Sequence, residues 1–160
     1  EDPSAAASAA AAALGKSDGE NEAAPMLLAQ TVAALGSLAQ GGAFALRMGT
    51  MLEHTSTGLV YLLCSCFAEV RVCRPVAAHA SSDETWVVCN GFKSVSQRFL
   101  DRLVQAVGPQ WRRKDGTALT MVPKALIPPA WIAQMRNCAT LFAGLQCRSM
   151  ERDHVTEGAT

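Results

Sequence analysis

The chain has 160 residues, of which 49% are apolar and 18% are charged, and its 14 basic side chains balance its 14 acidic ones. That length fits one domain with a core and excludes wholesale disorder, while zero net charge means that any RNA contact must be local. No apolar run is long enough to span a membrane, and no signal peptide is present. Because the chain begins at Glu1 rather than Met, we expect a fragment.

The first 24 residues differ in composition from the rest. Residues 5–13 are alanine interrupted only by Ser8, and residues 15–22 are rich in glycine and acidic side chains. Such a segment has too little side-chain volume to drive packing. We therefore predict a low-complexity linker over residues 1–24, a folded domain over residues 25–150 and a disordered tail over residues 151–160.

Chain breakers and hydrophobic periodicity predict the first half of the domain. A helix begins at Pro25, where proline is tolerated, and ends at the glycine pair 41–42. The apolar run at residues 43–46 has the pattern of a buried parallel strand. A second helix is expected to begin near Ser56 and to include Phe67.

The second half contains two more strands and two more helices. Apolar, β-branched and aromatic residues predict strands at residues 70–73 and 85–89, and the short loop between these strands makes them antiparallel. Residues 94–97 have the pattern of a capping box for a helix that closes at Gly108, and a last amphipathic helix starts near Ala130. The fold class is therefore α/β, with the order of half a three-layer sheet whose missing half lies upstream.

The six cysteines and three histidines show no spacing typical of metal sites. Cys64 and Cys66 form a CxC in a helix-like run, which points their side chains about 200° apart. No CxxC or HxxxH motif occurs elsewhere in the sequence. We predict no metal site, and we expect reduced cysteines packed as small apolar residues in a reducing compartment.

Residues 41–47, with the sequence GGAFALR, resemble the GG-x-F-x-x-K strand of the FtsJ-like RNA 2′-O-methyltransferases. The resemblance continues through residues 48–93, and residues 122–146 are most similar to the cap-2-type enzymes of that family. It implies the C-terminal half of a Rossmann-like sheet with its last strands antiparallel. It also implies S-adenosylmethionine as methyl donor and capped mRNA as substrate, in the nucleus or the cytoplasm.

This family uses a Lys-Asp-Lys-Glu tetrad, and the resemblance places its glutamate on Glu84 and its second lysine on Arg47. Arginine is a departure, because a guanidinium can stabilise an oxyanion but cannot act as a base. The resemblance places the aspartate, which would also contact S-adenosylmethionine, on Asp2, or on Asp18 instead. The first lysine and the glycine-rich cofactor loop would belong to the upstream half.

Three hypotheses follow from these residues. The parent protein is an active cap methyltransferase, or Arg47 marks lost chemistry in a non-catalytic module that binds RNA or a protein partner, and in either case the fragment alone is inactive. Trp111 beside the basic residues 112–114 could contact RNA, although the pattern fits a solvated loop better.

Overall fold

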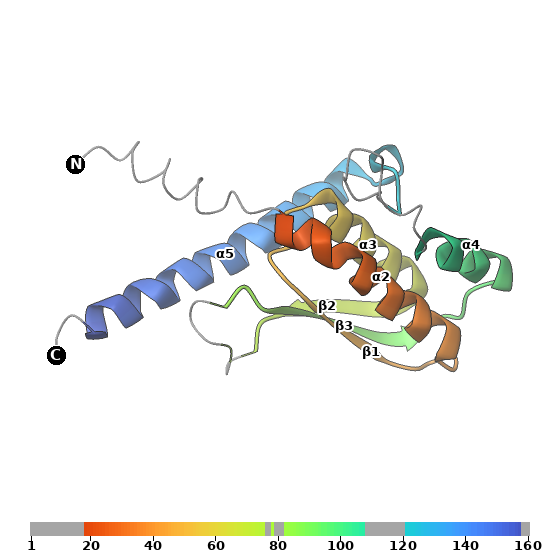
Figure 1. Cartoon of the computed structure of the whole chain (residues 1–160), viewed down its shortest axis with the longest axis horizontal. Coiled ribbons are helices and arrows are strands. Elements are labelled where there is room, and N and C mark those ends of the chain that lie inside the picture. The colour runs from red at the N-terminus through yellow and green to blue at the C-terminus, as the bar shows by residue number, and fades with distance from the viewer. Residues whose placement is uncertain (1–17, 76–77, 79–81, 108–120, 158–160) are drawn as a thin grey trace.

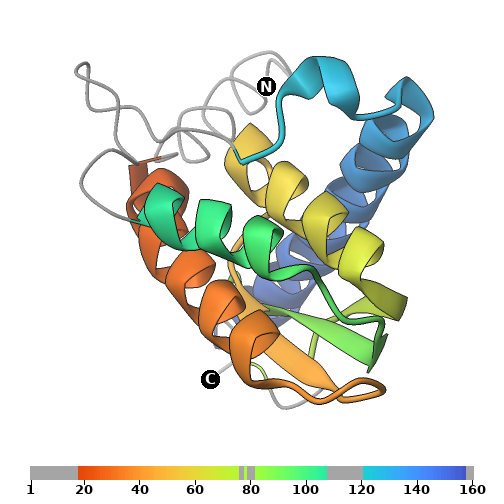
Figure 2. The same ribbon diagram turned by 90° about the vertical axis from the view of Figure 1, so that its right-hand side faces the viewer.

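The computed structural model describes residues 18–75, 78, 82–107 and 121–157. Its elements in chain order are α2 (Asp18–Ser37), β1 (Phe44–Met48), α3 (His54–Cys66), β2 (Phe67–Cys73), β3 (Thr85–Phe92), α4 (Gln97–Val107), the 3₁₀ helix η2 (Lys124–Leu126) and α5 (Pro129–Glu157). Helices α2 and α3 lie over one face of a three-stranded sheet, with α4 beside α2 and α5 beside α3 (Figures 1 and 2). Within the described helices, none combines the length and apolarity that a membrane crossing requires.

Strand β3 is the centre of the sheet, whose order is β1-β3-β2. It pairs antiparallel with β1, where Leu46 faces Val87, and antiparallel with β2, where Val70 faces Cys89. The predicted mixed α/β architecture and the antiparallel last strands are confirmed. Among the described residues β1 pairs on one edge only, antiparallel to β3, so the parallel neighbour expected for residues 43–46 stays a prediction.

Burial alternates along the strands, which shows that the helices cover one face of the sheet. Leu46 and Met48 on β1 and Val87 and Cys89 on β3 are at most 3% exposed, whereas Ala45 beside them is exposed. Successive side chains on a strand point to opposite faces. The even-numbered residues of β3 up to Asn90 and the odd-numbered residues of β1 therefore lie on the face that no described helix covers. Phe92 departs from this alternation, since it follows Gly91 at φ 70° and is 3% exposed.

Helix α2 starts earlier than predicted. It begins at Asp18 and contains Pro25, so it crosses the boundary predicted at residue 24. Its buried stripe extends to both sides of that proline, since Ala24 and Leu28 are both buried. The packing of this stripe outweighs the backbone hydrogen bond that proline cannot donate.

The remaining element boundaries differ from the predictions for local reasons. Phe67 leaves α3 with an extended backbone and begins β2, where its ring is 1% exposed. The predicted capping box at 94–97 is two residues out of register, because it is the Ser96 hydroxyl that accepts a hydrogen bond from the Phe99 backbone N–H, at 3.3 Å. Helix α5 begins at Pro129 and continues to Glu157, through most of the residues that we predicted as a tail.

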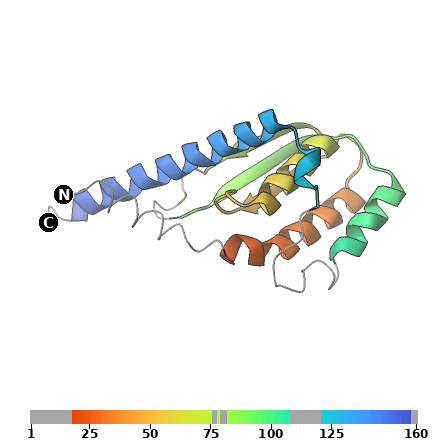
Figure 3. The same cartoon turned by 90° about the horizontal axis from the view of Figure 1, so that it is seen from above.

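Figure 3 shows α5 running past the end of the sheet. Its N-terminal part packs on the core through Met135 and Ala139, which are 5% and 3% exposed. Farther along, Leu141 and Leu145 are 57% and 40% exposed. The first turns of α5 therefore belong to the core, and the later turns present apolar side chains to solvent.

One residue in the connection from β1 to α3 has a left-handed backbone. Met51 has φ 58° and is not glycine, yet its side chain is only 2% exposed. A bulky residue in that region of φ is uncommon and strained. The burial of its side chain in the core compensates for the turn that redirects the chain from strand to helix.

The cysteines are all free, as predicted, but they fall into two groups. Cys66 and Cys89 are buried, and Cys64 and Cys138 pack against the same core. The remaining two, Cys73 and Cys147, are exposed, so the expectation that they pack as apolar residues is wrong for these two. Burial, together with the neighbouring thiols of Cys64 and Cys66, raises the pKa of the Cys89 thiol to about 12.

These thiols are expected to differ in reactivity. At pH 8 an aromatic disulfide reagent should label Cys73 and Cys147 rapidly and Cys89 only after unfolding, because the thiolate is the nucleophile. Absorbance of the released thiol in native and denaturing buffer measures the two groups. A double Cys73→Ser, Cys147→Ser variant serves as control and should lose the fast phase; a fast phase that survives would contradict the assignment.

The core predicts a large difference between two leucines. Leu63 is 0% exposed, so Leu63→Ala should destabilise the fold by about 2–5 kcal/mol through lost burial and a residual cavity. Leu126 is 67% exposed, and Leu126→Ala should change stability by no more than about 0.5 kcal/mol. Urea unfolding followed by circular dichroism measures both, and equal losses would contradict this account of the core.

Candidate functional site

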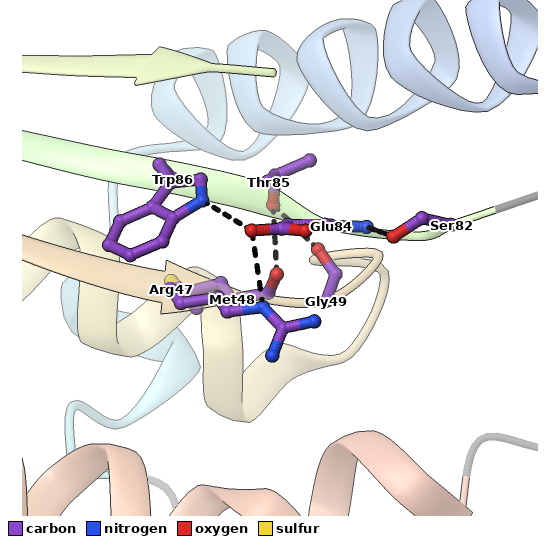
Figure 4. A network of polar contacts seen from close by, with 7 residues as sticks. All are labelled: Arg47, Met48, Gly49, Ser82, Glu84, Thr85 and Trp86. Carbon is purple, nitrogen blue, oxygen red and sulfur yellow. Dashed lines mark hydrogen bonds and ion pairs between the residues drawn. The ribbon is translucent and has the colours of Figure 1, made fainter. Parts of the chain in front are cut away.

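The structure brings Arg47 and Glu84 together on the uncovered face of the sheet. Arg47 lies on β1 directly opposite Trp86 on β3, and Glu84 is the residue just before β3. The Nε atom of Arg47 is 3.4 Å from Oε1 of Glu84, and the indole Nε1 of Trp86 donates to the same oxygen at 2.8 Å (Figure 4). One carboxylate oxygen therefore meets a cation from one strand and a neutral donor from the next.

Local hydrogen bonds fix the position of the backbone that carries Glu84. The buried hydroxyl of Thr85 donates to the backbone carbonyl of Gly49 at 2.7 Å and lies 3.4 Å from that of Met48. These contacts join the end of β1 to the beginning of β3 (Figure 4). The backbone N–H of Glu84 donates to the hydroxyl of Ser82 at 3.1 Å, which holds the preceding turn.

Gly49 follows the last residue of β1 and lies close to the loop before β3. A Cβ at this position would lie 3.2 Å from Oδ2 of Asp83, closer than most side chains tolerate. The absence of a side chain thus leaves room for the turn that presents Glu84.

The pair is accessible to a substrate. The Arg47 side chain is 63% exposed and that of Glu84 is 24% exposed. An ion pair so open to water contributes only about 0–1 kcal/mol to stability. Its geometry is therefore held by the strands and by Trp86, which leaves the guanidinium available to a negatively charged group.

The other predicted site residues cannot be placed. Asp2 and residues 111–114 lie outside the described residues, and Asp18 is the first residue of α2 with no side-chain surroundings described. Within the described segments, no three His, Cys, Asp or Glu side chains gather as a metal site would require. Whether an aspartate completes the site stays a prediction.

Trp86 is a site residue that sequence reasoning missed. Its indole anchors Glu84, yet the sequence showed it only as an aromatic in a strand. The spacing of Trp86 and Glu84 could have revealed this contact, because residues two apart on a strand share a face.

Comparison with known proteins identifies the class to which this fold and site belong. No protein-family model matches the chain. Curated relatives do match: it is 30% identical over 132 residues to the cap-specific mRNA (nucleoside-2′-O-)-methyltransferase 2 of Danio rerio and 33% identical over 126 residues to that of Mus musculus. These alignments cover 81% and 78% of the chain but 17% and 16% of the relatives.

The chain therefore belongs, over that segment, to the family of cap-specific mRNA 2′-O-methyltransferases. It is also similar to the type 1 protein of Homo sapiens, at 37% identity over 104 residues, covering 64% of the chain and 12% of the relative. The alignments with the type 2 proteins of Danio rerio and Mus musculus extend over more of the chain. The resemblance seen in the sequence is confirmed.

The geometry predicts that two neighbouring residues differ in their contribution to stability. Thr85→Val should lower the free energy of unfolding by about 1–3 kcal/mol, because a buried carbonyl loses its donor. Glu84→Gln keeps an oxygen for Trp86 and should change stability by no more than about 1 kcal/mol. Urea unfolding measures both variants, and a larger loss for Glu84→Gln would contradict the surface character of the ion pair.

Proposed function

We propose that the protein containing this chain methylates a ribose 2′-hydroxyl of capped mRNA and that Arg47 and Glu84 form part of its catalytic site. The observation that carries the proposal is the 3.4 Å approach of these two side chains, at the positions that the resemblance gives to two tetrad members. The curated relatives bear the same activity in their names. The proposed methylation takes place in the nucleus or the cytoplasm, where capped mRNA is made and used.

The sheet supports a Rossmann-like arrangement extended by further strands. Among the described residues, β1 pairs on one side only, so its other edge is available for pairing. One face of the sheet carries the helices, and the other exposes Arg47. Three-layer α/β domains cover both faces and hold ligands at the carboxyl ends of their strands.

The methyl donor proposed is S-adenosylmethionine, which supplies an electrophilic methyl group when bound. Among the described residues, no glycine-rich loop follows a strand, so this segment alone does not form a complete donor site. Asp2, or alternatively Asp18, is the proposed contact from this chain. The steps below concern only the hydroxyl that accepts the methyl group.

A ribose hydroxyl becomes a better nucleophile as it loses its proton. The guanidinium of Arg47 can donate hydrogen bonds to the negative charge that develops on the oxygen. It does not take up the proton, which leaves to Glu84 or to water. Glu84 contacts the guanidinium through Nε, and the terminal nitrogens of Arg47 take no part in this ion pair.

Arg47 also supports a second candidate function. Because a guanidinium stays protonated at workable pH, replacing the family's lysine is the change expected of a module that binds capped RNA or a protein partner without catalysis. The two functions differ in what restoring lysine does.

The experiment is a methyl-transfer assay on capped RNA with the full-length gene product. Glu84→Gln and Arg47→Ala should each slow transfer at least about 100-fold, because each removes an electrostatic partner of the reacting oxygen. Arg47→Lys should retain or increase transfer. Transfer that is absent in the wild type and appears only with lysine would favour the non-catalytic module.

The chain offers a matched control for these substitutions. Arg71 and Glu69 form another exposed arginine–glutamate pair, on β2, in which Nε of Arg71 donates to Oε1 of Glu69 at 2.8 Å. Arg71→Ala and Glu69→Gln should leave methyl transfer within about two-fold of wild type. Equal losses at the two pairs would refute a specific role for Arg47 and Glu84.

A further inference from the structure

A hollow open to solvent, of about 600 Å³ with its mouth included, lies outside the Arg47–Glu84 site, where α3 begins. We call it the α3 pocket. Three of its lining residues, His54, Lys124 and Arg136, carry basic side chains, and they come from α3, η2 and α5 respectively. Thr57 and apolar side chains, including Met51 and Ile132, line the rest of it.

The charge of the α3 pocket is uncompensated within the described chain. Lys124 and Arg136 are exposed, and neither has an ion pair with a described residue. None of the described residues that line the hollow is acidic. Two cations whose side chains border one cavity repel each other, and an anion between them would remove that repulsion.

The imidazole of His54 adds a nitrogen that has no hydrogen-bond partner among the described residues. Its Nε2 atom is buried, and no described residue makes a hydrogen bond to it. An unpaired buried polar atom is costly, and in native structures it calls for an unseen partner. In one neutral tautomer Nε2 carries a proton and can donate it to an oxygen.

The N-terminus of α3 also favours an anion in this pocket. His54 is the first residue of α3, and the N-cap residue Glu53 makes no side-chain hydrogen bond to the first turn. Free backbone N–H groups and the helix dipole attract anions to such an end. The dipole here only reinforces what the basic side chains and the unpaired imidazole indicate.

We propose that the α3 pocket binds a phosphate group of the RNA strand, with Lys124 and Arg136 as its cationic contacts and the His54 imidazole as a hydrogen-bond donor. This inference rests on the proposed function for the choice of RNA as the source of the phosphate. Only six residues separate Arg47 from His54 along the chain, so their Cα atoms are at most about 25 Å apart. One RNA strand can therefore reach both places.

The test measures binding rather than methylation. The probe is a fluorescein-labelled, uncapped single-stranded RNA of about ten nucleotides, and anisotropy with the 160-residue chain is recorded at several salt concentrations. A Lys124→Ala, Arg136→Ala double variant should bind about ten-fold more weakly. Its salt dependence should be shallower by about 0.7 in log–log slope, the value for one lost phosphate contact on a single strand.

A matched control removes the same charge elsewhere. Arg102 on α4 and Arg148 on α5 are exposed and do not line the α3 pocket. The Arg102→Ala, Arg148→Ala variant should bind RNA as the wild type does, within about two-fold. Equal weakening of both double variants would overturn the proposal, since it would show a diffuse electrostatic effect.

His54→Phe tests the hydrogen bond from the imidazole, because phenylalanine keeps a ring but has no N–H donor. This variant should weaken binding several-fold, since the phosphate loses one donor. Circular dichroism and urea unfolding verify that each variant is folded. An unchanged affinity in folded His54→Phe would show that the imidazole has no part in RNA binding.

Competition identifies the source of the phosphate. At constant ionic strength, inorganic phosphate or a phosphoserine peptide should displace the RNA only at millimolar concentration. Displacement at micromolar concentration of either would overturn the choice of RNA. If the wild type methylates capped RNA while the pocket variant binds RNA normally, this inference alone fails; RNA bound at the pocket without any methyl transfer refutes the proposed function instead.

Discussion

The antiparallel pairing of β3 with both of its neighbours is the constraint on which the rest of the structure depends. It joins Phe44–Met48 to residues that lie about forty positions later and places Trp86 opposite Arg47. The same register turns Val87 and Cys89 toward the helices, where both are 0% exposed. A register shift of one residue would exchange the buried side chains for the site side chains, so core and site are specified together.

Much of this arrangement can be predicted from the sequence, and the rest cannot. The strand that begins at Thr85 is predicted by β-branched and aromatic residues, and the antiparallel pairing by a short loop. Helix α2 is missed before Pro25, because local rules end a helix at proline, whereas Ala24 gains burial only when the tertiary core forms. The antiparallel pairing of residues 44–48 with β3 was not predicted, because an apolar run reports burial, not the direction of a neighbour.

The candidate site was predicted in the same uneven way. The positions of Arg47 and Glu84 come from a resemblance and not from residue chemistry, and the structure brings these two side chains within 3.4 Å. Trp86 escapes notice because its partner is defined only by the strand geometry. The α3 pocket joins residues from three elements, and no spacing along the chain links His54 to Lys124 and Arg136.

Met51 links these two places. It stands between the strand that carries Arg47 and the helix that begins at His54, in a left-handed backbone and with its side chain 2% exposed. Glycine would relax that backbone but empty the space, and a β-branched residue would fill space but resist the turn. The residue at position 51 must therefore tolerate a positive φ and also fill a space in the core, and few side chains do both. Any replacement that satisfies only one would alter the angle between strand and helix, and with it the separation of the two surfaces that an RNA strand would have to reach at once.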